Sequence, residues 1–205
     1  MITILNRVAR WREDGIRSEA DPRQIEKLLR DLQMCGSKAV SVPGVKPSGD
    51  WEDAEEQELT LVEKTLFRAG VARFNYLSTD RPDVAFTVKE LCRCMSSPKP
   101  SDMMALKRVC RYLKGRGRLV QLIPTVPRDG GDQWNLKVYV DSDWAGCRKT
   151  RKSTNGGCLV INGTCLRLWS STQAVLALSS GEAEYYAALK GACIALGFQS
   201  MARDL

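Results

Sequence analysis

The spacing of apolar residues changes once along this chain, and that change limits the available folds more than any other feature. Four segments carry apolar side chains at three- and four-residue intervals, which predicts helices; they are residues 22–34, 59–72, 84–95 and 103–115. From residue 134 the apolar residues alternate instead, and two short runs flank Asn162-Gly163, a strong hairpin signal. An alanine-rich helix is expected after Ser179. The sequence therefore predicts an α+β or α/β protein with a helical first part, followed by three antiparallel strands and a helix.

Local signals mark where two of these helices begin. Asp21 is the expected N-cap of the first helix, with Pro22 at its first helical position. Ser101 is the expected N-cap of the fourth helix. The expected buried face of that fourth helix consists of Met104, Val109, Tyr112 and Leu113.

The segments outside these helices divide into one strand and two connectors. Residues 2–11 roughly alternate, which predicts one strand that runs to a turn at Asp14-Gly15. Residues 38–58 and 124–133 are rich in proline, glycine and charged side chains. We expect both to be exposed connectors.

Composition narrows the possible chemistry. The chain has 205 residues and no histidine, which excludes an imidazole base, a histidine-paired nucleophile and histidine-ligated metal. Lysine and arginine number 31 against 24 acidic residues, a net charge of +7 that favours a polyanionic partner without proving one. The eight cysteines form no C-x-x-C pair, so we expect small buried side chains in a reducing compartment and no zinc site.

No apolar run approaches the roughly 20 residues that a membrane span requires. The first residues, MITILNRVARWRED, carry charge early and contain no small-residue cleavage site. We therefore expect an intracellular chain, in the cytoplasm or nucleus, with no membrane partner.

Four carboxylates cluster in the pattern of the last third. Asp141 and Asp143 lie two apart on a predicted strand, so both side chains point to the same side of it. Glu182 and Glu184 lie at the start of the last predicted helix. If the helix crosses the sheet beside Asp141, one carboxylate from each element could share a Mg²⁺ ion, which accepts oxygen ligands alone. The alternative is that these acids are helix-capping or solvated groups.

Basic residues form two groups. One lies on the fourth predicted helix and beyond it; its members are Arg108, Arg111, Lys114, Arg116 and Arg118. The other follows the predicted strand with the two aspartates and consists of Arg148, Lys149, Arg151 and Lys152. A solvated surface is the simplest interpretation of both groups, and contact with nucleic-acid phosphates is the alternative. Trp144 and Trp169 are expected to pack in the core, with base stacking as the alternative.

Three stretches of the sequence together resemble one family. They are RFNYLSTDRPDVAFTVKELCRCM, ALKRVCRYLKGRGRL and YVDSDWAGCRKTRKSTNGGCLVINGTCLRLWSSTQAVLALSSGEAEYYAAL. Read in this order, with DSDWAG, RKST and LSSGEAEY, they resemble the Pol polyprotein of copia-type LTR retrotransposons, where reverse transcriptase ends and ribonuclease H begins. The resemblance covers about residues 59–205.

The resemblance implies a fold, an activity and a ligand set. The fold is RNase H-like, and the activity is hydrolysis of the RNA strand of RNA–DNA hybrids by a pair of Mg²⁺ ions. The catalytic and metal-ligating residues of the family fall on Asp141 and Glu184. The neighbours Asp143 and Glu182 then have electrostatic or capping roles. The resemblance also suggests that Arg108, Arg111 and Lys114, and the group from Arg148 to Lys152, contact the hybrid.

The sequence departs from the family pattern after the last helix. The third and fourth acidic ligands of the family belong to later elements, and Asp204 does not replace them, because ~1.5 Å per residue places it about 30 Å along the helix from Glu184. We therefore expect the RNase H-like part to be truncated and its nuclease activity to be impaired.

The sequence patterns and the resemblance together predict that the chain has three regions. Residues 1–50 are expected to be the tail of the reverse transcriptase, 51–128 a helical connection region and 129–205 a partial RNase H-like domain. The expected partners are an RNA–DNA hybrid and the rest of the polyprotein. Two alternatives to an enzyme fragment stay open: a non-catalytic remnant that binds hybrids, and a fragment that pairs with another chain through an exposed strand edge.

Overall fold

The computed structural model describes residues 1–5, 7–44, 58–125, 135–147 and 149–204. The chain divides into two compact units, which are considered one at a time. The first contains residues 1–11 and 17–121, and the second contains residues 12–16 and 122–205. The expected boundary at residue 50 falls among residues that are not described, and the three expected regions stay a prediction.

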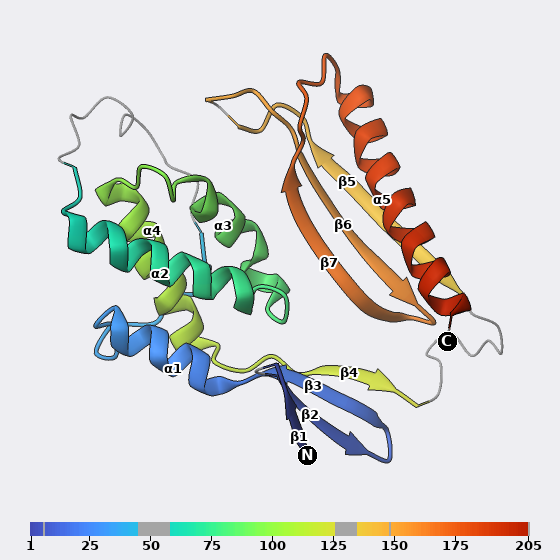
Figure 1. The fold of residues 1–205 in the computed structure, drawn as a ribbon, viewed down its shortest axis with the longest axis horizontal. Helices are drawn as coiled ribbons and strands as arrows, with labels where there is room; N and C mark the ends of the chain where they lie inside the picture. The colour runs from blue at the N-terminus through green and yellow to red at the C-terminus, as the bar shows by residue number, and fades with distance from the viewer. Residues whose placement is uncertain (6, 45–57, 126–134, 148, 205) are drawn as a thin grey trace. The chain divides into compact units, whose positions relative to one another are not determined.

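Four helices build the first unit (Figure 1). They are α1 (Pro22–Asp31), α2 (Leu61–Leu77), α3 (Pro82–Arg93) and α4 (Pro100–Gly115). The Asp21 side chain accepts a hydrogen bond from the Arg23 amide, so the predicted N-cap of α1 is confirmed. The prediction of Ser101 as N-cap of α4 is wrong: Lys99 is the N-cap, because Pro100 takes the first helical position, where a missing N–H is harmless.

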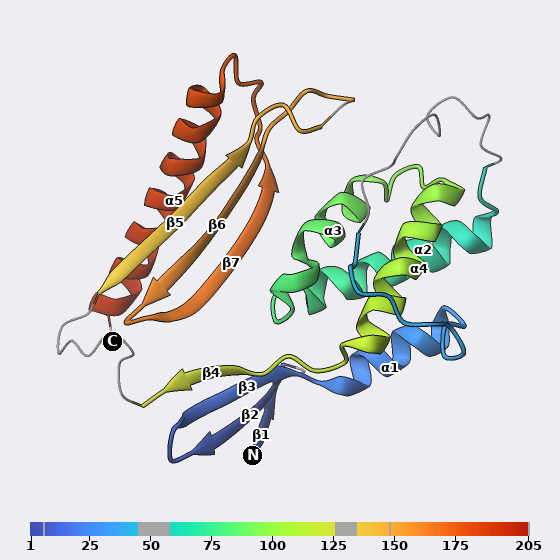
Figure 2. The same cartoon turned by 180° about the vertical axis from the view of Figure 1, so that it is seen from behind.

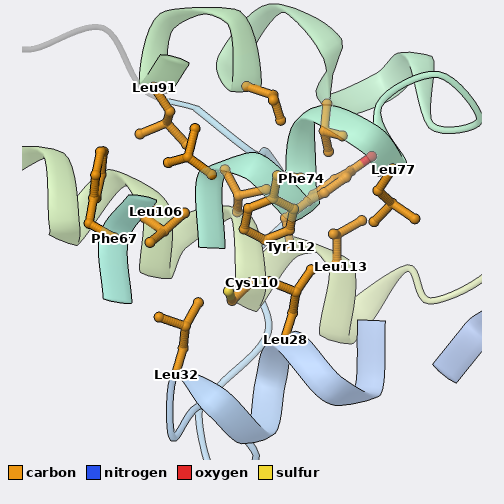
Figure 3. Packing of buried hydrophobic residues seen from close by; sticks show 14 of the residues in the cluster. Leu28, Leu32, Phe67, Phe74, Leu77, Leu91, Leu106, Cys110, Tyr112 and Leu113 are labelled. Carbon is orange, nitrogen blue, oxygen red and sulfur yellow. The ribbon is translucent and has the colours of Figure 1, made fainter. Parts of the chain in front are cut away.

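Apolar side chains from all four helices form one buried cluster (Figure 3). Phe67 and Phe74 of α2 are completely buried in it, together with Leu106 of α4. Met104 of α4, expected in the core, is 66% exposed, and Met103 is buried in its place. The helical period is therefore as predicted, but the buried face of α4 begins one residue earlier than expected.

Short strands accompany the helices. They are β1 (Ile2–Ile4), β2 (Arg7–Arg12), β3 (Gly15–Ala20) and β4 (Gln121–Pro124), in the sheet order β1-β2-β3-β4. The single strand expected over residues 2–11 is wrong, since Leu5 has φ 48° and the chain reverses there to pair β1 with β2. Gly15 has φ 140°, and a Cβ there would lie 2.2 Å from the Ile123 carbonyl oxygen, so only glycine fits this approach of β4.

The second unit contains a three-stranded antiparallel sheet and one long helix. The elements are β5 (Leu136–Asp143), β6 (Thr154–Ile161), β7 (Thr164–Thr172) and α5 (Ser180–Arg203), and the sheet order is β5-β6-β7. Asn162 and Gly163 both have positive φ, 48° and 76°, as a type I′ hairpin turn requires. The predicted order of three strands and a helix, and the α+β class, are confirmed.

Helix α5 packs on β5 through small residues. Ala183, Ala187 and Gly191 are the buried residues of α5. A Cβ on Gly191 would lie 2.6 Å from a methyl carbon of Val140 and 3.1 Å from one of Val138, so glycine allows the helix to approach the strand closely. Figure 2 shows α5 running along β5 in the opposite direction, as does Figure 1. The start of α5 and the end of β5 therefore lie at the same end of the unit.

None of the helices in the described part of the chain combines the length and the hydrophobicity needed to cross a bilayer.

Candidate functional site

The carboxylates of β5 lie on one face of the strand. Val138, Val140 and Ser142 alternate with Asp141 and Asp143, and both aspartates are exposed while the other three residues are partly buried. Val138 and Val140 pack against α5. Asp141 and Asp143 alternate with them, so these two side chains belong to the face of β5 that points away from the helix. The two aspartates therefore share one side of β5, as the alternation of the sequence predicts.

Glu184 approaches the same end of the unit from α5. It is exposed and follows the buried Ala183 in the first turns of the helix. Among the described strands β5 pairs only with β6, so its other edge carries no strand. Asp141, near the end of β5, and Glu184, near the start of α5, thus lie at the same end of the second unit.

Glu182 has a structural role. Its Oε2 accepts a hydrogen bond from the Leu178 amide at 2.7 Å, and its own amide donates to the Ser179 hydroxyl at 3.1 Å. This reciprocal arrangement caps the start of α5, as expected for Glu182. Its other oxygen accepts a hydrogen bond from Tyr186 at 3.2 Å, and this contact with the carboxylate raises the pKa of the Tyr186 hydroxyl.

Asp143 lies over the turn that follows β5. A Cβ on Gly146 would come within 1.9 Å of the Asp143 Oδ2 atom, so glycine leaves room for this carboxylate. The turn is held further by the Ala145 amide, which donates to the Ser153 hydroxyl at 3.1 Å. Asp143 is thus part of the turn as well as a neighbour of Asp141.

A buried glutamine joins the ends of these elements. Gln173, directly after β7, donates hydrogen bonds from its side-chain amide to Asn155 on β6 and to the Ala183 carbonyl on α5. No sequence pattern singles out this residue, because a glutamine after a strand is not a signal by itself. Only its contacts distinguish it.

The described residues contain no group of three or more acidic, cysteine or histidine side chains placed to hold a metal ion. The exposed carboxylates of Asp141 and Glu184 lie at this end of the unit, beside the carboxylates of Asp143 and Glu182. Carboxylate oxygens suit Mg²⁺, which keeps several waters and takes substrate phosphates as further ligands. The donor set therefore fits a hard cation held in part by substrate or water.

The basic side chains on α4 face neighbouring carbonyls. Arg111 Nε donates to the Lys38 carbonyl at 2.7 Å, and Lys114 Nζ donates to the carbonyls of Cys35 and Ser37. Arg108 is partly buried. These contacts tie the segment after α1 to α4, and binding of nucleic acid by Arg108, Arg111 and Lys114 stays a prediction.

The second basic group is only partly described. Arg148 lies outside the described residues, whereas Lys149 and Arg151 are exposed. Lys152 Nζ donates to the Ala174 carbonyl at 2.6 Å. Lys149 and Arg151 are thus the described members of this group that present charge at the surface close to Asp143 in sequence.

The two tryptophans of the second unit differ in their environment. Trp144 is 47% exposed and donates from its indole nitrogen to the Ala177 carbonyl at 3.1 Å. The ring of Trp169 lies directly over Gly157, where a Cβ would come within 2.2 Å of it. Trp169 therefore packs on the sheet as a partly buried side chain, whereas the core packing expected of Trp144 is wrong, because this side chain is held at the surface.

No family model and no solved structure matches the chain. Curated relatives do match it, and three of them cover most of this chain. The mitochondrial protein AtMg00810 of Arabidopsis thaliana is 34% identical over 181 residues, which are 87% of this chain and 71% of the relative. The Pol polyprotein from transposon RE1 of the same plant is 32% identical over 168 residues, which are 80% of this chain and 11% of the polyprotein.

The third relative is the Pol polyprotein from transposon TNT 1-94 of Nicotiana tabacum, 31% identical over 170 residues, or 81% of this chain. The chain spans 12% of that polyprotein, so it corresponds to a short segment of the transposon proteins. The two Pol polyproteins among these relatives belong to the family that the three motif stretches of the sequence resemble. The chain belongs to the copia-type retrotransposon Pol polyprotein family.

Proposed function

We propose that the second unit is the RNase H-like part of a Pol polyprotein and acts on RNA–DNA hybrids, with Asp141 and Glu184 as ligands of a divalent cation. The observation that carries this proposal is that the end of β5 and the start of α5 lie at the same end of the second unit, each with an exposed carboxylate. Family membership and the motif order DSDWAG, RKST and LSSGEAEY support the same assignment.

Each residue has a defined task in this proposal. Asp141 and Glu184 hold the ion, which supplies charge stabilisation and an activated water for in-line displacement at a phosphate. Glu182 caps the start of α5 and so keeps Glu184 in place, whereas Asp143 lies over the turn that follows β5. Lys149 and Arg151 attract the phosphates of the hybrid, which gives affinity that falls as salt rises.

A second function, hybrid binding without cleavage, is favoured by one observation. The described residues contain no group of three or more acidic, cysteine or histidine side chains that could hold a metal ion, whereas a two-metal displacement needs a larger ligand set. We therefore expect the isolated chain to bind an RNA–DNA hybrid and to turn it over slowly or not at all. Cleavage in Mg²⁺ that Glu184→Gln abolishes would contradict this expectation and favour the complete enzyme.

Manganese binding tests the proposed ligands. Titration of the chain with Mn²⁺, followed by loss of the free-ion electron paramagnetic resonance signal, should reveal one site of millimolar or tighter affinity. Asp141→Asn and Glu184→Gln should each weaken Mn²⁺ binding by about tenfold or more, since each removes one of two charged ligands. Even substitution of residues that only hydrogen-bond to metal ligands lowers metal affinity by roughly 10–100-fold.

Asp143→Asn is the matched control, because Asp143 lies on the same side of β5 and differs from Asp141 by two positions. It should change the Mn²⁺ affinity less than threefold. Equal losses in all three variants would indicate a diffuse attraction of cations to the acidic surface, and the absence of any site in the wild-type chain would contradict the proposal directly.

A further inference from the structure

Gln173 is one of the few buried polar residues of the second unit. It is 4% exposed and lies in the connection between β7 and α5. Its backbone amide donates to the Ser153 carbonyl at 2.8 Å, which fixes the backbone of this connection beside the start of β6. This main-chain hydrogen bond therefore fixes the backbone of Gln173 independently of its side-chain contacts.

The side-chain amide of Gln173 then connects two elements. Its Nε2 donates to Asn155 Oδ1 on β6 at 2.5 Å and to the Ala183 carbonyl on α5 at 2.8 Å. Both of these bonds are buried. Buried hydrogen bonds of this kind are costly to break, because an acceptor left without its donor also loses the water that would replace it.

The partners of Gln173 are the neighbours of the proposed ligands. Asn155 is paired in register with Ser142, the residue between the two aspartates of β5. Ala183 directly precedes Glu184. A continuous path of contacts thus runs from the end of β5 through Asn155 and Gln173 to the first turns of α5.

We infer that Gln173 is a positioning residue that fixes the start of α5, and with it Glu184, relative to Asp141. This inference rests on the proposed function for its consequence, the metal site, but its structural part stands on the contacts alone. It adds a residue that touches neither metal nor substrate and acts through the placement of Glu184.

The rest of the helix interface explains why such a residue is needed. Elsewhere α5 meets the sheet through Ala187 and Gly191, whose packing has little directional preference along the helix axis. The first turn of a helix is also where fraying begins. Two directional hydrogen bonds at Ala183 and Asn155 oppose both movements at the point where a shift of the carboxylate matters most.

Gln173→Met tests the inference. Methionine keeps the length and approximate volume of glutamine but cannot donate, so Asn155 Oδ1 and the Ala183 carbonyl both lose their donor. Amide hydrogen exchange in the first two turns of α5 should accelerate about tenfold or more, while exchange in the last two turns changes little. The Mn²⁺ affinity of the chain should fall about tenfold.

Ser171→Ala is the matched control. It removes another polar contact between the sheet and α5, the hydrogen bond that Lys190 donates to the Ser171 hydroxyl, about two turns further along the helix. It should leave both the exchange of the first two turns and the Mn²⁺ affinity within threefold of the wild-type values. Gln173→Glu is a second variant of the same shape, and it should reproduce the faster exchange because a carboxylate cannot donate either.

The two readouts separate the claims. If exchange in the first turns of α5 is unchanged in Gln173→Met and in Gln173→Glu, the positioning role is wrong. If exchange accelerates but the Mn²⁺ affinity stays at the wild-type value, the residue has only a structural role and the inference is overturned. If the wild-type chain binds no Mn²⁺, the proposed function fails, and the exchange data still decide whether Gln173 fixes the helix start.

Discussion

Replacing Phe74 by alanine is expected to lower the free energy of unfolding of the first unit by about 3–5 kcal/mol. Phe74 of α2 is completely buried in the cluster that joins all four helices of this unit. Truncation removes the transfer free energy of the ring and leaves a cavity that the surrounding helices cannot fill without moving. A loss of this size is a large fraction of the total stability of an ordinary domain.

Denaturant unfolding and amide hydrogen exchange check this result. Phe86→Ala is the control with the same substitution, since Phe86 is 54% exposed and its ring contacts the Lys89 ammonium at 4.8 Å. It should cost no more than about 1 kcal/mol. Amides of β5, β6 and β7 should keep their protection in Phe74→Ala, because the second unit has its own sheet and helix. Similar losses in both variants would mean that this cluster is not the core that stabilises the unit.

Glu19→Gln is expected to have the second largest effect on the free energy of unfolding. The Glu19 side chain is 2% exposed, and Arg118 donates two hydrogen bonds to it, at 2.8 and 2.9 Å, while Arg10 forms a third contact. The hydrogen bonds from Arg118 are the main reason that the pKa of the Glu19 carboxyl lies below its ordinary value of 4.5. Glutamine would remove the negative charge and could place its NH₂ group opposite the N–H donors of Arg118 and Arg10. This change should lower the free energy of unfolding by about 2–3 kcal/mol at pH 7.

The pH dependence gives this prediction a sign. A carboxyl whose pKa is lowered by folding stabilises the folded state above its unfolded-state pKa, and loses that contribution as the pH falls through the folded-state value. The difference in unfolding free energy between wild type and Glu19→Gln should therefore be complete at pH 7 and shrink below about pH 4.5. Glu58→Gln, at an ion pair whose glutamate is 84% exposed, should show neither effect. A difference that is independent of pH would show that shape, not charge, sets the role of Glu19.

Features set by neighbouring residues could be predicted from the sequence. The Asp21 cap, the Asn162-Gly163 turn and the alternation that exposes Asp141 each depend on a few adjacent positions. The pairing of β3 with β4 could not be predicted in the same way, because it joins residues about a hundred positions apart. No local pattern in QLIP identifies its partner strand.

The candidate site shows the same division. Asp141, Glu182 and Glu184 could be selected from the strand end and the helix start. The carbonyl partners of Arg111 and Lys114 are more than 70 positions away in the chain, so the charge pattern, which indicated a solvated surface with phosphate contact as the alternative, could not predict this contact between segments. The side chain of Gln173 contacts two separate elements, β6 and α5, and no spacing rule predicts that pair of contacts.

Asp141 and Glu184 are proposed to bind one divalent ion at the end of the second unit where β5 ends and α5 begins. A crystal of the wild-type chain grown with Mn²⁺ and examined by anomalous scattering tests this claim most directly. We expect one strong peak, about 2.2 Å from a carboxylate oxygen of each of these two residues. A peak bound to only one of them, or to Asp143 and Glu182 instead, would contradict it.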